Sequence, residues 1–126
     1  MVGSKTDMEK QWPFEKLEVW KRAQDFADDI YQFSDTLPER ETYGLGDQIR
    51  RAAMSVVLNI AEGKGRDSDK EYTQFLYNAR GSLYEVVTCL RIAKRQELLK
   101  QQRAQKLENR AYEIHKMLSG LIQSLK

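Results

Sequence analysis

Apolar residues recur every three or four positions along most of this chain, a spacing that predicts amphipathic α-helices. The first predicted helix covers residues 15–37, where two apolar rows give it a wide buried face. Pro38 ends this helix, because proline lacks a backbone donor and disfavours helix at the residue before it. The two rows comprise Leu17, Val19, Trp20, Ala23, Phe26, Ala27, Ile30, Phe33, Ser34 and Leu37.

A second helix is predicted within residues 43–66, after a short polar loop at residues 39–42. We expect it to stop at residues 63–65, Gly-Lys-Gly, because glycine readily takes the left-handed conformation of a helix C-terminus. Its apolar positions are Leu45, Ile49, Ala52, Ala53, Val56 and Ile60.

Two further apolar repeats fill residues 68–126, and Ser68 with Glu71 forms a capping box at their start. Both repeats share one register, so one continuous helix also fits the pattern, but it would be about 88 Å long. Glu97 and Lys100 occupy core positions between the repeats, which predicts a turn at residues 96–102. Strand patterns are absent, so the sequence predicts an all-α protein, an up-down antiparallel four-helix bundle.

Polar side chains form a row beside the apolar face of the second helix. This row consists of Arg51, Ser55, Asn59 and Glu62. Buried polar groups need partners. One interpretation pairs Arg50 or Arg51 with Glu62, Glu71 or Glu85 of a neighbouring helix or subunit, while Ser55 and Asn59 bond to backbone. The other interpretation places the row in a pocket or pore.

The length of 126 residues predicts one domain, residues 14–126, preceded by a frayed or disordered polar segment at residues 1–13. A single cysteine, Cys89, lies among apolar residues, which favours a reducing compartment. The chain has neither an apolar run of about 18 residues nor the apolar core of a secretion signal. We therefore expect a cytoplasmic protein without a membrane partner.

Positive charge is concentrated in the last third of the chain. Residues 91–126 hold nine Lys and Arg against three Asp and Glu, whereas residues 1–90 hold 12 against 16. Basic residues three or four apart share helix faces and can follow a phosphate backbone, although such a row can also be solvated surface. With three basic residues near the second helix, the candidate nucleic-acid ligands are Arg50, Lys64, Arg66, Arg91, Lys94, Arg95, Lys100, Arg103, Lys106 and Arg110.

Catalytic and metal-binding patterns are missing from the sequence. The only histidine, His115, has Glu113 two residues before it, which does not match the Glu-x-x-His pair of di-metal bundles. The glycines at residues 63–66 lack the spacing of a phosphate-binding loop. We predict no enzyme, no metal and no cofactor. Tyr77 and Tyr84 lie off the main apolar row of their helix. Together with Trp20 they form a candidate second apolar surface, which favours a subunit contact over base stacking.

The chain resembles the bacterial family encoded within intervening sequences of 23S ribosomal RNA genes, also called the S23 ribosomal protein family. The matching elements are FEKLEVW (14–20), YGLGDQIRRAAMSVVLNIAEGKGR (43–66), SDKEYTQFLYNARGSLYE (68–85) and KMLSGLI (116–122). Many relatives carry proline where Val57 stands here. Within these elements, the residues assigned to a structural polar network or subunit contact are Arg51, Ser55, Asn59, Glu62, Glu71, Arg80 and Glu85.

The resemblance implies a ring-like homo-oligomer, a pentamer, with no established enzymatic activity. It also implies a fold similar to the accessory variability determinant of diversity-generating retroelements. The leading hypothesis is a non-enzymatic homo-oligomeric scaffold that binds RNA or DNA through basic surface residues. The alternatives are an accessory subunit of a retroelement reverse transcriptase and a purely structural protein-interaction module.

Overall fold

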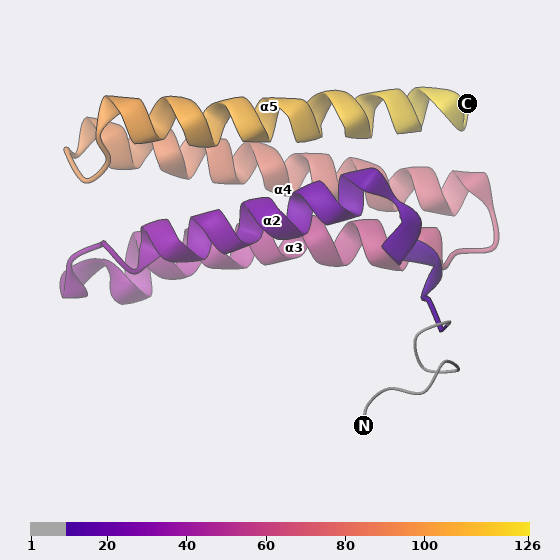
Figure 1. Ribbon diagram of the computed structural model, residues 1–126, viewed down its shortest axis with the longest axis horizontal. Helices are drawn as coiled ribbons and strands as arrows, with labels where there is room; N and C mark the ends of the chain where they lie inside the picture. Colours follow the sequence, from indigo (N-terminus) through magenta and orange to yellow (C-terminus); the bar gives the residue numbers. More distant parts are fainter. Residues whose placement is uncertain (1–9) are drawn as a thin grey trace.

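The computed structural model describes residues 10–126 and contains four long helices (Figure 1). These are α2 (Glu18–Ser34), α3 (Asp47–Lys64), α4 (Asp69–Arg95) and α5 (Gln101–Ser124). No strand occurs in the described part of the chain. The prediction of an all-α four-helix bundle is therefore confirmed.

Each helix packs against the next one in the chain, and α5 also packs against α2, so the four helices enclose one core. Figure 1 shows that consecutive helices run in opposite directions. The α4–α5 turn and the α2–α3 connection lie at one end of the bundle, and the α3–α4 connection and the C-terminus lie at the other. This is the predicted up-down arrangement.

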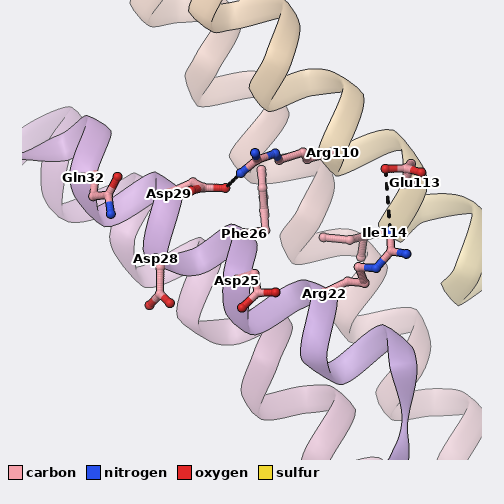
Figure 2. Close-up of a pocket in the computed structure, with 9 residues that line it drawn as sticks. All are labelled: Arg22, Asp25, Phe26, Asp28, Asp29, Gln32, Arg110, Glu113 and Ile114. Carbon is pink, nitrogen blue, oxygen red and sulfur yellow. Dashed lines mark hydrogen bonds and ion pairs between the residues drawn. The ribbon is translucent and has the colours of Figure 1, made fainter.

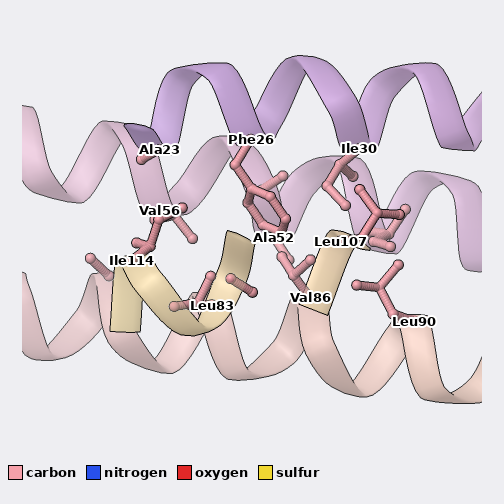
Figure 3. Close-up of a cluster of buried hydrophobic side chains, with 14 of the residues drawn as sticks. Ala23, Phe26, Ile30, Ala52, Val56, Leu83, Val86, Leu90, Leu107 and Ile114 are labelled. Carbon is pink, nitrogen blue, oxygen red and sulfur yellow. The ribbon is translucent and has the colours of Figure 1, made fainter. Parts of the chain in front are cut away.

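The core follows the apolar rows expected from the sequence. Figure 3 shows Phe26 and Ile30 of α2 facing Leu83 and Val86 of α4 across the interior. On α3 only Leu45, which precedes the helix, remains half-buried. The predicted core positions of α4 are all buried: Tyr72, Leu76, Ala79, Leu83, Val86, Leu90 and Ala93. Side chains from all four helices therefore share one hydrophobic cluster.

The first helix is shorter than predicted at both ends. The residues before it form a 3-10 turn, η1 (Pro13–Lys16), and Leu17 is extended with ψ 121°. At the other end, the Ser34 hydroxyl donates to the Tyr31 carbonyl oxygen at 2.8 Å, and the chain leaves the helix at the next residue. Local hydroxyl bonds of this kind compete with continued helix. The segment predicted to fray, residues 1–13, falls mainly on residues 1–9, which lie outside the described residues.

Two short segments connect α2 to α3: a 3-10 turn, η2 (Glu39–Glu41), and a π-helical turn, η3 (Thr42–Gly46). The backbone departs from helical geometry at Gly44, where φ is −105° and ψ is −108°. Regular α-helix therefore begins at Asp47. It runs without interruption through Val57.

The reason predicted for the end of α3 is wrong. Gly65, the residue after the helix, has a φ of −85°, and no glycine in residues 10–126 has a positive φ. Gly63 is needed for a different reason: a Cβ there would lie 2.8 Å from the Phe75 Cβ and 3.1 Å from a ring carbon of Tyr72. The glycine therefore lets α3 and α4 approach closely where the two helices diverge into their connection.

Local hydrogen bonds close both ends of α4. At its start, the Glu71 backbone N–H donates to the Ser68 hydroxyl at 3.1 Å, which confirms the predicted cap. At its end, the Leu98 N–H donates to the Ala93 carbonyl oxygen at 2.8 Å. Glu97 between them has a φ of 62°, the left-handed conformation of a Schellman turn. The turn falls where the sequence predicted it, although an exposed glutamate occupies the position that usually holds glycine.

Replacing Glu97 with glycine is expected to raise the free energy of unfolding by about 1 kcal/mol, because glycine adopts a positive φ without steric cost. Urea unfolding followed by circular dichroism measures the change. The matched control is Glu97→Ala, which removes the same carboxylate but keeps a Cβ, and should bring no gain. A similar gain in both variants would point to the carboxylate rather than to backbone strain.

Candidate nucleic-acid interface

Five exposed basic side chains gather at the end of the bundle formed by the α4–α5 turn. Lys94 and Arg95 lie in the last turn of α4, Lys100 precedes α5, and Arg103 and Lys106 lie in its first two turns. We call these five residues the basic end. None of them forms an ion pair with any residue of the range 10–126. Their charges are therefore available to a ligand.

The helix dipoles at the basic end oppose each other, because α4 ends there with a partial negative charge and α5 begins there with a partial positive one. The N-terminus of a helix carries a partial positive charge, so acidic residues there are stabilising and basic ones are not. The first turn of α5 holds no acidic residue, and Lys100 at its N-cap supplies no side-chain acceptor. The N-terminus of α5 therefore lacks a stabilising negative charge, which a bound anion would supply.

Two arginines of the predicted basic row are instead neutralised by neighbouring helices. Arg91 of α4 donates to both carboxylate oxygens of Glu108 on α5, at 2.7 and 2.8 Å. The Arg91 guanidinium, with a smaller contribution from Lys94, lowers the pKa of Glu108. Arg110 of α5 forms an ion pair with Asp29 of α2. Arg91 and Arg110 therefore join helices and offer less charge to phosphate than the sequence suggested.

Figure 2 shows the groove between α2 and α5, with a volume of about 520 Å³, into which the Arg110 pair projects. A second pair, Arg22 with Glu113, spans it at 3.8 Å. Asp25 and Asp28 also line the groove and pair with no cation among residues 10–126. This acidic surface repels phosphate, so it confines a nucleic-acid contact to other faces of the bundle.

The other three candidate ligands lie apart from the basic end or engage the chain itself. Lys64 and Arg66 lie at the opposite end, about 40 Å away along the 27 residues of α4. They stack over the rings of Tyr72 and Phe75, at 5.7 and 4.4 Å from the ring centroids. Arg50 donates to the Thr42 carbonyl oxygen at 3.2 Å and holds the π-helical turn against α3. Of the ten predicted nucleic-acid ligands, the five residues of the basic end therefore form the largest group that lies together without an ion-pair partner among the described residues.

The polar row of α3 makes structural contacts. The Ser55 hydroxyl lies 2.8 Å from the Ser82 hydroxyl of α4, and the Asn59 amide donates to the Ser55 carbonyl oxygen at 2.8 Å. Ser55 thus joins α3 to α4, whereas the Asn59 amide bonds within α3, to the Ser55 carbonyl oxygen and, at 3.0 Å, to the Ser55 hydroxyl. Arg51 is exposed and pairs within its own helix with Asp47, at 3.0 Å. The row is therefore a helix contact with an exposed arginine beside it.

Among residues 10–126, neither Arg50 nor Arg51 pairs with a carboxylate of a neighbouring helix, and a pairing with a neighbouring subunit stays a prediction. Glu85 instead accepts a hydrogen bond from Gln48. Glu62 and Glu71 are exposed, and neither forms an ion pair within residues 10–126. The side chains of α3 that hydrogen-bond to side chains of α4 are Gln48 and Ser55. Arg50 and Arg51 instead contact Thr42 and Asp47.

Arg80 forms a further polar contact between helices. Its guanidinium donates to the Ser119 hydroxyl of α5 at 3.1 Å and lies over the Tyr77 ring. Sequence reasoning missed Ser82 and Ser119, because a serine on a helix does not indicate which neighbour it faces. Asp47 was detectable, since it stands four residues before Arg51.

The remaining chemistry-bearing residues are packing residues. Burial, together with nearby Glu85, raises the pKa of the Cys89 thiol, which makes it a poor nucleophile. His115 is half-buried, and its Nδ1 lies 3.2 Å from the Tyr84 hydroxyl across the α4–α5 contact. Within residues 10–126 no cluster of three His, Cys, Asp or Glu is placed to hold a metal ion. No helix there is long and apolar enough to cross a bilayer.

Fold and contacts define the chain as an up-down four-helix bundle with a basic end. Residues 15–120 match the model of the 23S rRNA-intervening sequence protein family. The chain belongs to this family. The resemblance noted in the sequence is thereby confirmed, whereas a link to retroelement proteins is not established. Among curated proteins, none matches this chain.

A solved structure from Bacteroides thetaiotaomicron VPI-5482 shares the fold. It belongs to the S23 ribosomal protein family, is described as a protein with unknown function and is 25% identical to this chain. The match covers 82% of this chain and 97% of that one, with a TM-score of 0.78. The bundle is thus similar over nearly the whole length of that relative.

Proposed function

We propose that this protein is a non-enzymatic, homo-oligomeric four-helix bundle that binds RNA or DNA through its basic end. The observation that carries the proposal is the group of five exposed basic side chains around the α4–α5 turn, without an ion-pair partner among the described residues. Nucleic-acid affinity arises mainly from such contacts to phosphate. Membership of a family named for 23S rRNA intervening sequences agrees with this proposal without establishing it.

Removing three lysines from the basic end tests the proposal. Lys94→Ala, Lys100→Ala and Lys106→Ala together are expected to weaken binding of a labelled 20-nucleotide RNA or DNA strand about tenfold at low salt. The slope of log affinity against log salt should also fall by about 2, since each phosphate contact on a single strand contributes roughly 0.7. Fluorescence anisotropy measures both quantities.

The matched control is the combined replacement of Lys21, Lys70 and Lys126 by alanine. It removes the same charge from exposed positions outside the basic end. Its affinity should stay within about twofold of the parent protein, because distant exposed charges are screened beyond roughly 10 Å at 0.1 M salt. Equal weakening by the two triple variants would contradict a localised interface.

Exposed apolar side chains on two outer faces support assembly into a homo-oligomer. Met54 and Leu58 are 46% and 50% exposed on α3, and Tyr77 and Ile92 are 36% and 48% exposed on α4. Two distinct patches on one subunit suit a head-to-tail contact that closes a ring. A pentameric ring is the form that the family resemblance implies.

Gly81 provides a test of this assembly. It lies in the middle of α4 on the face of Tyr77, and a Cβ there would meet nothing within 4 Å. In an isolated bundle Gly81→Ala should raise the free energy of unfolding by about 1 kcal/mol. If a second subunit packs closely over this face, the added methyl group should instead shift the assembly toward smaller species. Light scattering across a dilution series measures the mass.

Gly120→Ala is the matched control, because a Cβ at Gly120 would also meet nothing within 4 Å. Among the exposed large apolar side chains, only Tyr112 belongs to α5, and it lies eight residues before Gly120. Gly120→Ala should leave the mass unchanged. An unchanged mass in Gly81→Ala as well would argue against an interface at this face.

The alternative role beside a reverse transcriptase stays a prediction, since no feature of residues 10–126 tests it.

A further inference from the structure

A second groove, between α4 and α5, has a volume of about 490 Å³ and an aromatic wall. We call it the α4–α5 groove, and it is bounded by Tyr84 and Arg91 of α4 and by Glu108, Tyr112 and His115 of α5. Its volume lies within the range of small-ligand sites, and Leu83, Val87 and Ala111 contribute apolar surface to its lining. Nothing in the proposed phosphate contact uses this groove.

The aromatic side chains of the groove are exposed and held in place. Tyr84 is 49% exposed and Tyr112 is 61% exposed. The His115 ring lies between them, with centroids 5.6 Å from Tyr84 and 5.5 Å from Tyr112. The bond between the Tyr84 hydroxyl and His115 Nδ1 joins the two helices at this point. The groove therefore holds two exposed tyrosine rings on a helical support, and the Lys116 Nζ lies over the Tyr112 ring, 5.5 Å from its centroid.

The groove leads toward the basic end. A smaller hollow of about 130 Å³ contains Lys94 and shares Arg91, Gln105 and Glu108 with the groove. The Glu108 carboxylate is neutralised by its paired bonds to Arg91, so it does not oppose an anionic chain. From Lys100 to Tyr112 the distance along α5 is about 18 Å, or roughly five nucleotides at 3.4 Å each.

Aromatic faces beside a basic surface favour one ligand chemistry. Single-stranded nucleic acid is bound by side chains that stack on its bases and by cations that contact its phosphates. Thr88 and Asn109 line the same groove. The Thr88 hydroxyl donates to the Tyr84 carbonyl oxygen and can still accept from a base edge, and the Asn109 carbonyl accepts from Gln105 while its amide nitrogen can donate. A base inside a duplex is already stacked and paired, so it cannot enter the α4–α5 groove.

Resting on the proposed function, we infer that the α4–α5 groove stacks an unpaired base of a single-stranded RNA or DNA whose neighbouring phosphates lie on the basic end. Tyr112 is the principal stacking platform, because it is the most exposed ring of the groove. The protein should accordingly prefer a single strand to a duplex of the same length.

The test compares Tyr112→Leu with Tyr112→Phe, using a 12-nucleotide single strand that carries 2-aminopurine and the corresponding duplex. Tyr112→Leu should weaken single-strand binding about fivefold or more and abolish the quenching of 2-aminopurine, while duplex affinity stays unchanged. Tyr112→Phe keeps the ring and should bind as the parent does. Tyr31→Leu removes a tyrosine of α2 outside the groove, and serves as the control for a general loss of aromatic surface.

Three results would overturn the inference. If Tyr112→Leu weakens single strand and duplex equally, or neither, the groove does not stack a base. If Tyr112→Leu changes the mass measured by light scattering, the groove is a contact between subunits. If the parent protein binds neither strand form at low salt, the proposed function itself fails, which is distinguishable from failure of the stacking site alone.

Discussion

Replacing Gly63 with alanine is expected to lower the free energy of unfolding by about 1 kcal/mol. The new Cβ would lie 2.8 Å from the Cβ of Phe75, an atom fixed to the α4 backbone, so the two helices must separate. Overpacking of this kind costs about 1–3 kcal/mol. The better helix propensity of alanine returns only about 1 kcal/mol, so the clash dominates. Urea unfolding at a fixed protein concentration measures the difference.

Gly65→Ala is the matched control for this substitution. Gly65 has a negative φ, and a Cβ there would meet its nearest atom, the Glu62 carbonyl oxygen, at 3.5 Å, an ordinary contact. Its stability should therefore change by less than about 0.5 kcal/mol. A loss at Gly65 as large as that at Gly63 would indicate that the turn, rather than the helix contact, requires glycine.

Replacing Phe26 with alanine is expected to lower the free energy of unfolding by about 3–5 kcal/mol, more than any other substitution proposed for this bundle. The Phe26 side chain is 2% exposed and projects into the shared core (Figure 3). Truncation removes a buried aromatic ring and leaves a cavity that four packed helices fill only in part. Because α2 packs against both α3 and α5, the loss affects the whole bundle.

Thermal and urea unfolding of Phe26→Ala measure this loss, and Tyr31→Ala on the same helix is the control. Tyr31 is 38% exposed, so its truncation should cost less than about 1 kcal/mol. Similar losses in the two variants would contradict a core centred on Phe26. Retention of helical circular dichroism with lost cooperativity would instead indicate a bundle that stays collapsed but is no longer uniquely packed.

The fold was largely predictable because its apolar rows have a single periodicity and only two prolines interrupt it. The α4–α5 turn was also placed correctly, since Glu97 and Lys100 cannot sit in a core. Two features could not be predicted from the sequence. The π-helical turn before α3 depends on tertiary contacts such as the bond from Arg50 to Thr42. The role of Gly63 depends on how closely two helices approach, which no local pattern encodes.

The candidate interface was predictable only as a set of charges. Periodicity places Arg91 and Arg110 on a basic row, but it does not show that Glu108 and Asp29 of other helices neutralise them. Charge density along a chain is local, whereas a surface potential depends on which helices are neighbours.

The central claim is that the basic end binds nucleic acid through phosphate contacts, and the salt dependence of binding tests it most directly. Anisotropy of a labelled 20-nucleotide single strand is measured with the unaltered protein between about 50 and 300 mM salt. Five phosphate contacts predict that log affinity falls against log salt with a slope of about −3 to −4. A flat dependence, or no binding at the lowest salt, would contradict the claim.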